Sequence, residues 1–112
     1  MKLETSDCIA ILSLNEAEIR EKFQVSEMSL FGSTARGDQK DDSDVDLLVK
    51  MPPKITLVVE LKDFLENKLN KEVDIIRKRT TLSEDFLNLI SKDVISIFWD
   101  RKAKDFVKLE IN

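Results

Sequence analysis

Two aspartates near the middle of the chain, Asp44 and Asp46, have a spacing that could place two carboxylates at one site. They are separated by Val45, and residues two apart on a β-strand project from the same face of a sheet. Two carboxylates that converge in this way repel each other unless a cation lies between them. Mg²⁺ suits such a position because it takes hard oxygen ligands and usually shares them with substrate phosphates. The pair therefore predicts a magnesium site.

A third acid, Asp74, interrupts the otherwise apolar segment 73–76. A carboxylate buried without a partner is costly, so an acid within an apolar strand needs a charged or polar neighbour. If this strand lies beside the strand that carries Asp44 and Asp46, the three acids form a metal-binding triad. Two metal ions held there could activate an acceptor oxygen and stabilise a leaving pyrophosphate. The alternative interpretation is an exposed strand position for Asp74.

A glycine–serine pair, Gly32-Ser33, follows an expected strand and precedes a short helical turn. Gly32 and Gly37 are the two glycines of the chain, so backbone freedom is concentrated in this segment. The first turn of a helix presents unpaired N–H groups and the positive end of a dipole to an anion. The Ser33 hydroxyl adds a donor and Arg36 adds a positive charge, which suits the phosphates of a nucleotide. The alternatives are an ordinary tight turn at Gly32-Ser33 and a surface cation at Arg36.

The composition excludes several kinds of chemistry. The chain of 112 residues contains no histidine, which removes Ser-His-Asp and Cys-His catalysis and histidine-ligated zinc. Its single cysteine, Cys8, excludes an intramolecular disulfide and fits a reducing, cytoplasmic location. The net charge of −4 argues against sequence-independent binding of nucleic acid. No apolar run approaches a membrane span of roughly 20 residues, so we expect no membrane association.

The hydrophobic pattern predicts a single domain over residues 1–112, in the α/β (α+β) class, with a mixed β-sheet covered by helices. The clearest helix is expected from Thr56 to Leu69. There an apolar stripe recurs at the spacing of helical turns and should face the core, and Asn70 suits a left-handed cap. The other expected elements are a helix from a Ser13–Glu16 capping box to about Lys22, strands at Val25–Phe31, Asp44–Met51, Val73–Arg77 and Val94–Trp99, a loop at 32–43 with a short helix, and helices at Ser83–Ser91 and 100–112.

The order of these motifs resembles the minimal nucleotidyltransferases (MNT) of the DNA polymerase β superfamily. Their pattern is Gly-Ser, ten residues, Asp-x-Asp, and then a third acid on a later strand. This chain has Gly32-Ser33, ten residues, Asp44-x-Asp46, and then Asp74. The spacing is specific, because each residue type must occur at a fixed distance from the others.

The resemblance implies a polymerase-β-like nucleotidyltransferase fold whose motif-bearing core spans about residues 13–99. It implies that Asp44 and Asp46 hold Mg²⁺, with two ions expected, and that Asp74 ligates one ion and helps to deprotonate the acceptor. It also implies that the glycine–serine pair holds the triphosphate of ATP.

Chains of this size are similar to the antitoxins of HEPN/MNT toxin–antitoxin pairs. The resemblance implies transfer of AMP from ATP to a tyrosine of a HEPN-domain ribonuclease toxin encoded alongside. Because this chain has no tyrosine, a tyrosine acceptor must lie on another protein. Two alternatives remain open: nucleotidyl transfer to a small-molecule or nucleic-acid hydroxyl, and a non-catalytic antitoxin that neutralises its toxin by binding. The net charge weighs against the first, and the intact set of acids weighs against the second.

Overall fold

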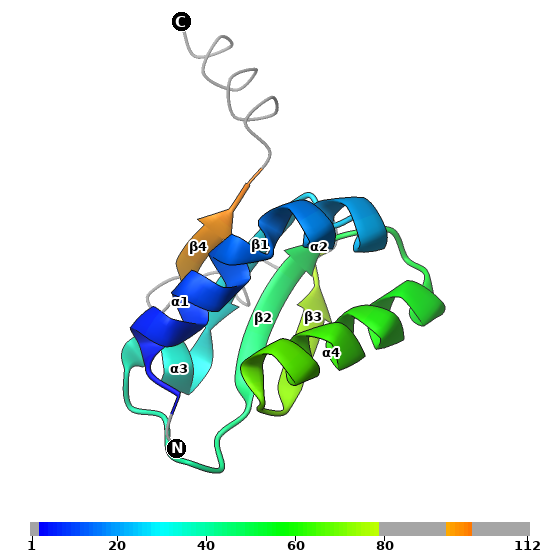
Figure 1. Ribbon diagram of the computed structural model, residues 1–112. Coiled ribbons are helices and arrows are strands. Elements are labelled where there is room, and N and C mark those ends of the chain that lie inside the picture. Colours follow the sequence, from blue (N-terminus) through cyan, green and yellow to red (C-terminus); the bar gives the residue numbers. More distant parts are fainter. Residues whose placement is uncertain (1–2, 79–93, 100–112) are drawn as a thin grey trace, which may run out of the picture.

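The computed structural model describes residues 3–78 and 94–99 of the chain. Figure 1 shows helices and a β-sheet packed as two layers, which confirms the expected α+β class. The helices that cover one face of the sheet are α1 (Thr5–Leu14), α2 (Glu16–Phe23) and α4 (Ile55–Leu69), and a short helix α3 (Gly32–Arg36) follows directly on the first strand. The strands are β1 (Glu27–Phe31), β2 (Val45–Lys50), β3 (Val73–Arg77) and β4 (Ile95–Phe98).

The sheet is mixed, with the spatial order β3-β2-β1-β4. β1 runs antiparallel to both of its neighbours, β2 and β4, whereas β2 and β3 run parallel. A parallel pair needs a crossover connection, and α4 supplies it between β2 and β3. Consequently the first residues of β2 and the first residues of β3 lie at the same edge of the sheet.

Strand β2 shows why the sequence forms a half-polar, half-apolar sheet. Val45, Leu47 and Val49 are buried in one hydrophobic core with residues of the covering helices. Asp46 and Lys50 alternate with them and therefore project from the opposite face. The expectation that Val45 is buried while its acidic neighbour points the other way is confirmed.

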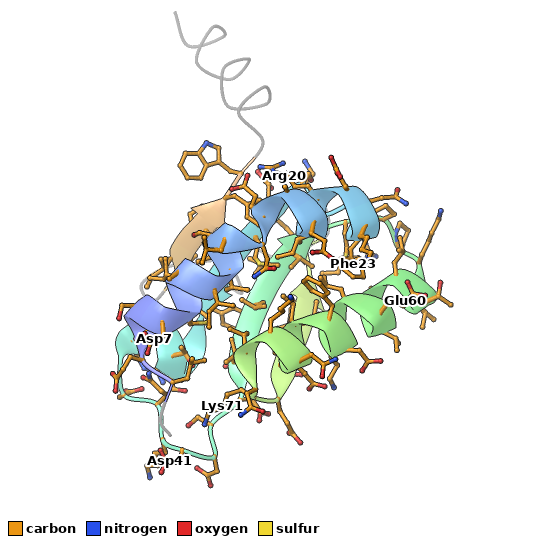
Figure 2. All side chains as sticks on the ribbon, viewed as in Figure 1. Asp7, Arg20, Phe23, Asp41, Glu60 and Lys71 are labelled. Atoms are coloured by element: carbon orange, nitrogen blue, oxygen red, sulfur yellow. The ribbon has the colours of Figure 1, made fainter. Side chains whose placement is uncertain are left out.

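Helix α4 also agrees with its apolar periodicity. Leu61, Leu65 and Leu69 are buried, and Phe64 packs against them from the edge of the core. The helix ends as expected at Asn70, whose backbone adopts the left-handed conformation with φ 54° and ψ 41°. The predicted apolar stripe is therefore core. Figure 2 shows Phe23 of α2 pointing toward α4, where its ring centroid lies 5.2 Å from that of Phe64.

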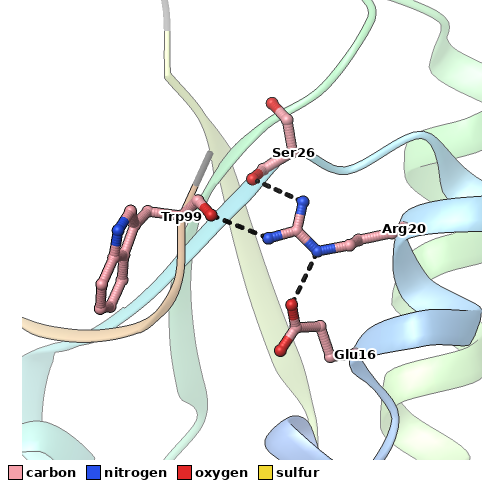
Figure 3. A network of polar contacts seen from close by, with 4 residues as sticks. All are labelled: Glu16, Arg20, Ser26 and Trp99. Carbon is pink, nitrogen blue, oxygen red and sulfur yellow. Dashed lines mark hydrogen bonds and ion pairs between the residues drawn. The ribbon is translucent and has the colours of Figure 1, made fainter. Parts of the chain in front are cut away.

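The edge strand β4 is tied to the rest of the fold by Arg20 of α2, as Figure 3 shows. Its guanidinium donates to Glu16 Oε2 at 2.8 Å, to the Ser26 carbonyl at 3.3 Å and to the Trp99 carbonyl at 2.9 Å. The same group lies 4.6 Å from the centroid of the Phe98 ring. One planar side chain thus joins α2, the entry to β1 and the exit from β4.

The N-terminal region differs from the expectation. The predicted capping box at Ser13 is wrong, because Ser13 lies inside α1 and α2 is preceded by Asn15. The Asn15 amide instead donates to the Ile11 carbonyl at 2.7 Å, which closes the end of α1. Helix α1 itself was not expected from the sequence. It buries Cys8 and Leu12, which are four residues apart and so share one helix face.

Cys8 behaves as a small core residue. Burial raises the pKa of its thiol from 9.0 to about 11, so the thiol is protonated and unreactive at neutral pH. The helices expected at Ser83–Ser91 and 100–112 lie outside the described residues. Among the helices that are described, none combines the length and the apolar character needed to cross a bilayer.

Candidate active site

The strand register brings two of the three candidate acids side by side. Phe31 of β1 is opposite Asp46 of β2, and Asp46 is in turn opposite Asp74 of β3. Adjacent strands are about 4.8 Å apart, so the Asp46 and Asp74 side chains emerge from the sheet as direct neighbours. The condition set by the sequence, that the strand bearing Asp74 lies beside the strand bearing Asp46, is met.

The glycine–serine turn is packed directly against the second acid. Gly32 follows Phe31 at the end of β1, and its φ of +77° is in the left-handed region that favours glycine. A β-carbon at this position would lie 3.2 Å from Cγ of Asp46 and closer still to a carboxylate oxygen. A side chain at position 32 therefore collides with Asp46, and glycine is required for two independent reasons.

Helix α3 places Ser33 next to this contact. The Ser33 carbonyl accepts hydrogen bonds from the N–H groups of Gly37 at 2.9 Å and Asp38 at 3.1 Å, which closes the short helix. The Ser33 side chain is half-buried, and its hydroxyl makes no hydrogen bond within the part of the chain described here. It is therefore available as a donor to a ligand beside Asp46.

The electrostatic state of Asp46 reflects its surroundings. Burial, then the charge of Asp74, then that of Asp44 raise the pKa of Asp46 above its ordinary value of 3.8, while Arg36 lowers it. The Arg36 guanidinium is exposed and forms an ion pair with Asp38 at 3.2 Å. The cation is thus close enough to act on Asp46 through space while it also pairs with a loop carboxylate.

The other two candidate acids, Asp44 and Asp74, are both exposed, and they differ in their position relative to Asp46. Asp44 immediately precedes β2 and is exposed. Asp74 is also exposed, so the premise that it is a buried carboxylate is wrong, although its position beside Asp46 agrees with the prediction. In residues 3–78 and 94–99, no three acidic or cysteine side chains are already close enough together to hold a metal ion.

These residues nevertheless fit a divalent cation. The donor set is made of carboxylate oxygens, which are the hard ligands that Mg²⁺ prefers. Burial and then the charges of Asp74 and Asp44 raise the pKa of Asp46, and a bound cation would offset the repulsion between these carboxylates. The metal roles of Asp44, Asp46 and Asp74 remain predictions.

The loop acids agree with the solvated interpretation. Asp38, Asp41 and Asp42 are exposed and precede β2 without a strand to orient them. Figure 2 shows Asp41 and Lys71 at the same end of the molecule, where the Lys71 ammonium donates to the Asp41 carbonyl. This contact attaches the loop to the turn before β3, and so to the segment that carries Asp74.

Two residues that support the site were not identified from the sequence. The Thr5 hydroxyl, at the start of α1, donates to the Thr34 carbonyl of α3 at 2.6 Å. The Glu66 carboxylate of α4 accepts a hydrogen bond from the Val73 N–H at 3.0 Å, directly before Asp74. For Thr5, the local sequence signal was the polar run Glu4–Asp7 that contains it. In the structure the Glu4 N–H donates to the Asp7 carboxylate at 3.3 Å.

Comparison with known proteins identifies the kind of site. A family profile described as "Nucleotidyltransferase domain" matches residues 15–107. The protein adenylyltransferase MntA of Thermococcus cleftensis is 36% identical over 90 residues, which are 79% of this chain and 90% of that protein. A solved minimal nucleotidyltransferase candidate is 32% identical, with a TM-score of 0.61 and coverage of 85% of this chain and 95% of the other.

A more distant structure shares the fold. It is a chain of the complex between the tri-AMPylated HEPN toxin and the MNT antitoxin of Shewanella oneidensis, with a TM-score of 0.59 and 15% identity. The match covers 88% of this chain and 78% of that one.

A glycine–serine turn packed against one acid, with a second acid opposite it on the adjacent strand of a mixed sheet, is an arrangement that fits a nucleotidyltransferase. The chain belongs to the nucleotidyltransferase domain family, with the family profile covering most of its length. The prediction of a minimal nucleotidyltransferase of the DNA polymerase β superfamily is thereby confirmed.

Proposed function

We propose that this chain transfers AMP from ATP to a hydroxyl of a partner protein and thereby acts as the antitoxin of a HEPN-domain toxin encoded alongside. The observation that supports this most directly is that Gly32 packs against Asp46, while Asp46 lies opposite Asp74 on the neighbouring strand. The turn that we propose to bind phosphate therefore lies beside two carboxylates, as a nucleotidyl transfer requires. The adenylyltransferase relative from Thermococcus cleftensis supports AMP as the transferred group and a protein as its acceptor.

The reaction forms one bond and breaks another. The acceptor oxygen attacks the α-phosphorus of ATP, and the bond from that phosphorus to the bridging oxygen of pyrophosphate breaks. The acceptor proton is taken up by Asp74, whose exposed carboxylate is open to an approaching hydroxyl, or passes to solvent. Pyrophosphate leaves with the electron pair, so the products are an AMP ester of the acceptor and pyrophosphate.

The chain's own residues have separate tasks in this proposal. The Gly32 backbone and the Ser33 hydroxyl bind the triphosphate, and Arg36 contributes positive charge beside it. Asp44 and Asp46 would hold Mg²⁺, with Asp74 as a further ligand. The metal supplies charge neutralisation for the phosphates and lowers the pKa of the acceptor hydroxyl when it is bound.

The acceptor is proposed to be a tyrosine of the toxin. The fold shared with the complex that contains an AMPylated HEPN toxin supports a toxin as partner. This chain contains no tyrosine, so tyrosine modification cannot be self-modification. We expect the chain to form no stable complex with nucleic acid. We expect its location to be cytoplasmic.

The direct test is mass spectrometry of the product of the adjacent gene after incubation with this chain, ATP and Mg²⁺. The partner should gain mass in steps of one AMP, with tryptic peptides locating the label on tyrosine. Asp46→Asn should abolish the gain, whereas Asp63→Asn, which removes an exposed carboxylate from α4, should leave it unchanged. A partner that never gains mass while its toxicity is still suppressed would support a non-catalytic antitoxin instead. Label on RNA or on a small molecule would support nucleotidyl transfer to a nucleic-acid or small-molecule hydroxyl instead.

A further inference from the structure

An exposed apolar groove lies at the start of α4. Ile55 and Val59 are 81% and 52% exposed, and their spacing of four residues places them on one helix face. Single exposed apolar residues are common on proteins, but these two line one groove. Its described lining consists of Pro53, Lys54, Ile55, Val58, Val59 and Arg77.

The charge of the groove is opposite to that of the chain. Its described lining contains two cations, Lys54 and Arg77, and no carboxylate, whereas the chain has 22 acidic and 18 basic residues. Neither cation's side chain forms a hydrogen bond or an ion pair with the residues described in the structure. Covering the groove with an apolar surface alone would desolvate these charges without a partner, which is costly. The charges therefore favour an occupant that brings carboxylates to Lys54 and Arg77.

We propose that this groove, lined by 53–55, 58, 59 and 77, docks a segment of the partner toxin that presents apolar side chains flanked by aspartate or glutamate. The proposal rests on the proposed function for the identity of the partner. Ile55 and Val59 supply the apolar contact, and Lys54 and Arg77 set the orientation of the segment through charge pairing. A second copy of this chain is a poor occupant, because a two-fold interface centred on the groove would bring each pair of cations against its own copy.

The groove is well separated from the candidate active site. Arg77 is the last residue of β3 and Ile55 follows β2, whereas Asp46 and Asp74 lie near the first residues of these two parallel strands. Figure 1 shows the start of α4 and helix α3 on opposite sides of the molecule. Substitutions in the groove can therefore remove docking without touching the residues proposed to bind nucleotide.

The test measures binding of the adjacent gene product by calorimetry in the absence of nucleotide. The variants are Ile55→Ser with Val59→Ser, and separately Lys54→Glu with Arg77→Glu. Leu14→Ser is the matched control, because Leu14 is 85% exposed and lies outside the groove. Each groove variant should weaken partner binding by about tenfold or more, with unchanged nucleotide affinity, while Leu14→Ser binds like the parent. Circular dichroism confirms that each variant is folded.

Partner binding that is unchanged in both groove variants overturns the docking proposal. Self-association of the parent that Ile55→Ser with Val59→Ser abolishes also overturns it, in favour of a homodimer. A parent chain that does not bind the adjacent gene product overturns it as well. The two proposals fail separately. If the groove variants lose binding and the parent transfers no AMP, the docking proposal holds and the proposed enzymatic activity fails. If the groove variants bind normally and the parent transfers AMP, the proposed activity holds and the docking proposal fails.

Discussion

Gly32 packs directly against the side chain of Asp46. A β-carbon on Gly32 would lie 3.2 Å from the carboxyl carbon of Asp46. The contact is a consequence of the register, which sets Phe31 opposite Asp46 and lets the chain turn immediately afterwards. The turn that would hold phosphate and the carboxylate that would hold metal therefore cannot move independently. A single-atom addition at position 32 should disturb both.

Gly32→Ala should lower the free energy of unfolding by about 1–3 kcal/mol, because alanine is strained at a φ of +77° and clashes with Asp46. It should also weaken nucleotide binding by displacing the carboxylate. Gly37→Ala is the matched control, since its φ is +83° but its β-carbon would meet only Thr5 Oγ1 at 3.8 Å. Urea unfolding and calorimetry with a nucleotide analogue measure the two effects. Equal losses of nucleotide affinity in the two variants would contradict the clash.

Asp46→Asn should raise the melting temperature of the metal-free chain at neutral pH. Burial, Asp74 and Asp44 raise the native pKa of Asp46 above 3.8, so the folded chain keeps a proton that the unfolded chain has released. The free energy of unfolding therefore falls as the pH rises from about 3.8 through the raised native pKa. Asparagine cannot ionise, so the difference between variant and parent should vanish below that window.

Thermal melts of parent and Asp46→Asn across this pH range, with a chelator present, make the measurement. Asp63→Asn serves as the control and should follow the parent, because it removes an exposed carboxylate of α4 that is not one of the three candidate acids. Adding Mg²⁺ should raise the melting temperature of the parent at neutral pH and leave Asp46→Asn nearly unchanged. A variant that melts below the parent at neutral pH would refute the repulsion argument.

Arg20→Lys should destabilise the fold by about 1–2 kcal/mol although it preserves the charge. Lysine cannot reproduce the planar fork that reaches Glu16, Ser26 and the Trp99 carbonyl together, and it loses the stacking on Phe98. Lys22→Gln removes an exposed ion pair with Glu18 from the same helix and should cost less than about 0.5 kcal/mol. Urea unfolding compares them, and a similar small cost for both would mean that the fork does not stabilise β4.

Local patterns were sufficient where the structure depends on local spacing. The two-residue spacing in β2 predicted that Val45 is buried and that Asp46 faces the other way. The apolar stripe of α4 predicted which helix face meets the core, and Asn70 predicted the left-handed end of the helix. The strand at Val73–Arg77 begins and ends at the predicted residues. In each case the side-chain periodicity of one element decides which face meets the core.

The pairing of strands that are distant in the sequence could not be predicted and could only be assumed. No local pattern fixes which strand lies beside β2, so the neighbouring positions of Asp46 and Asp74 required the structure. The burial of Asp74 was inferred from its apolar neighbours in the sequence, and this inference is wrong. Which face of β3 is exposed depends on what packs against the whole sheet, and the sequence of β3 alone does not contain that information. Helix α1 was missed because Ser13 offered a plausible cap, whereas Cys8 and Leu12 gain their burial from tertiary contacts.

Ser33→Ala should weaken nucleotide binding by about 1–2 kcal/mol, or roughly 5- to 30-fold, with little change in stability. The hydroxyl has no hydrogen-bond partner among the described residues, so its removal leaves no protein group unsatisfied. Ser13→Ala, at an exposed position of α1, controls for the loss of a hydroxyl elsewhere. Calorimetry with a non-transferable ATP analogue and Mg²⁺ gives the affinities, and urea unfolding gives the stabilities. If Ser33→Ala binds the analogue as tightly as Ser13→Ala does, the serine of the turn does not contact the phosphates, and the backbone N–H groups at Gly32 and Ser33 must bind them without it.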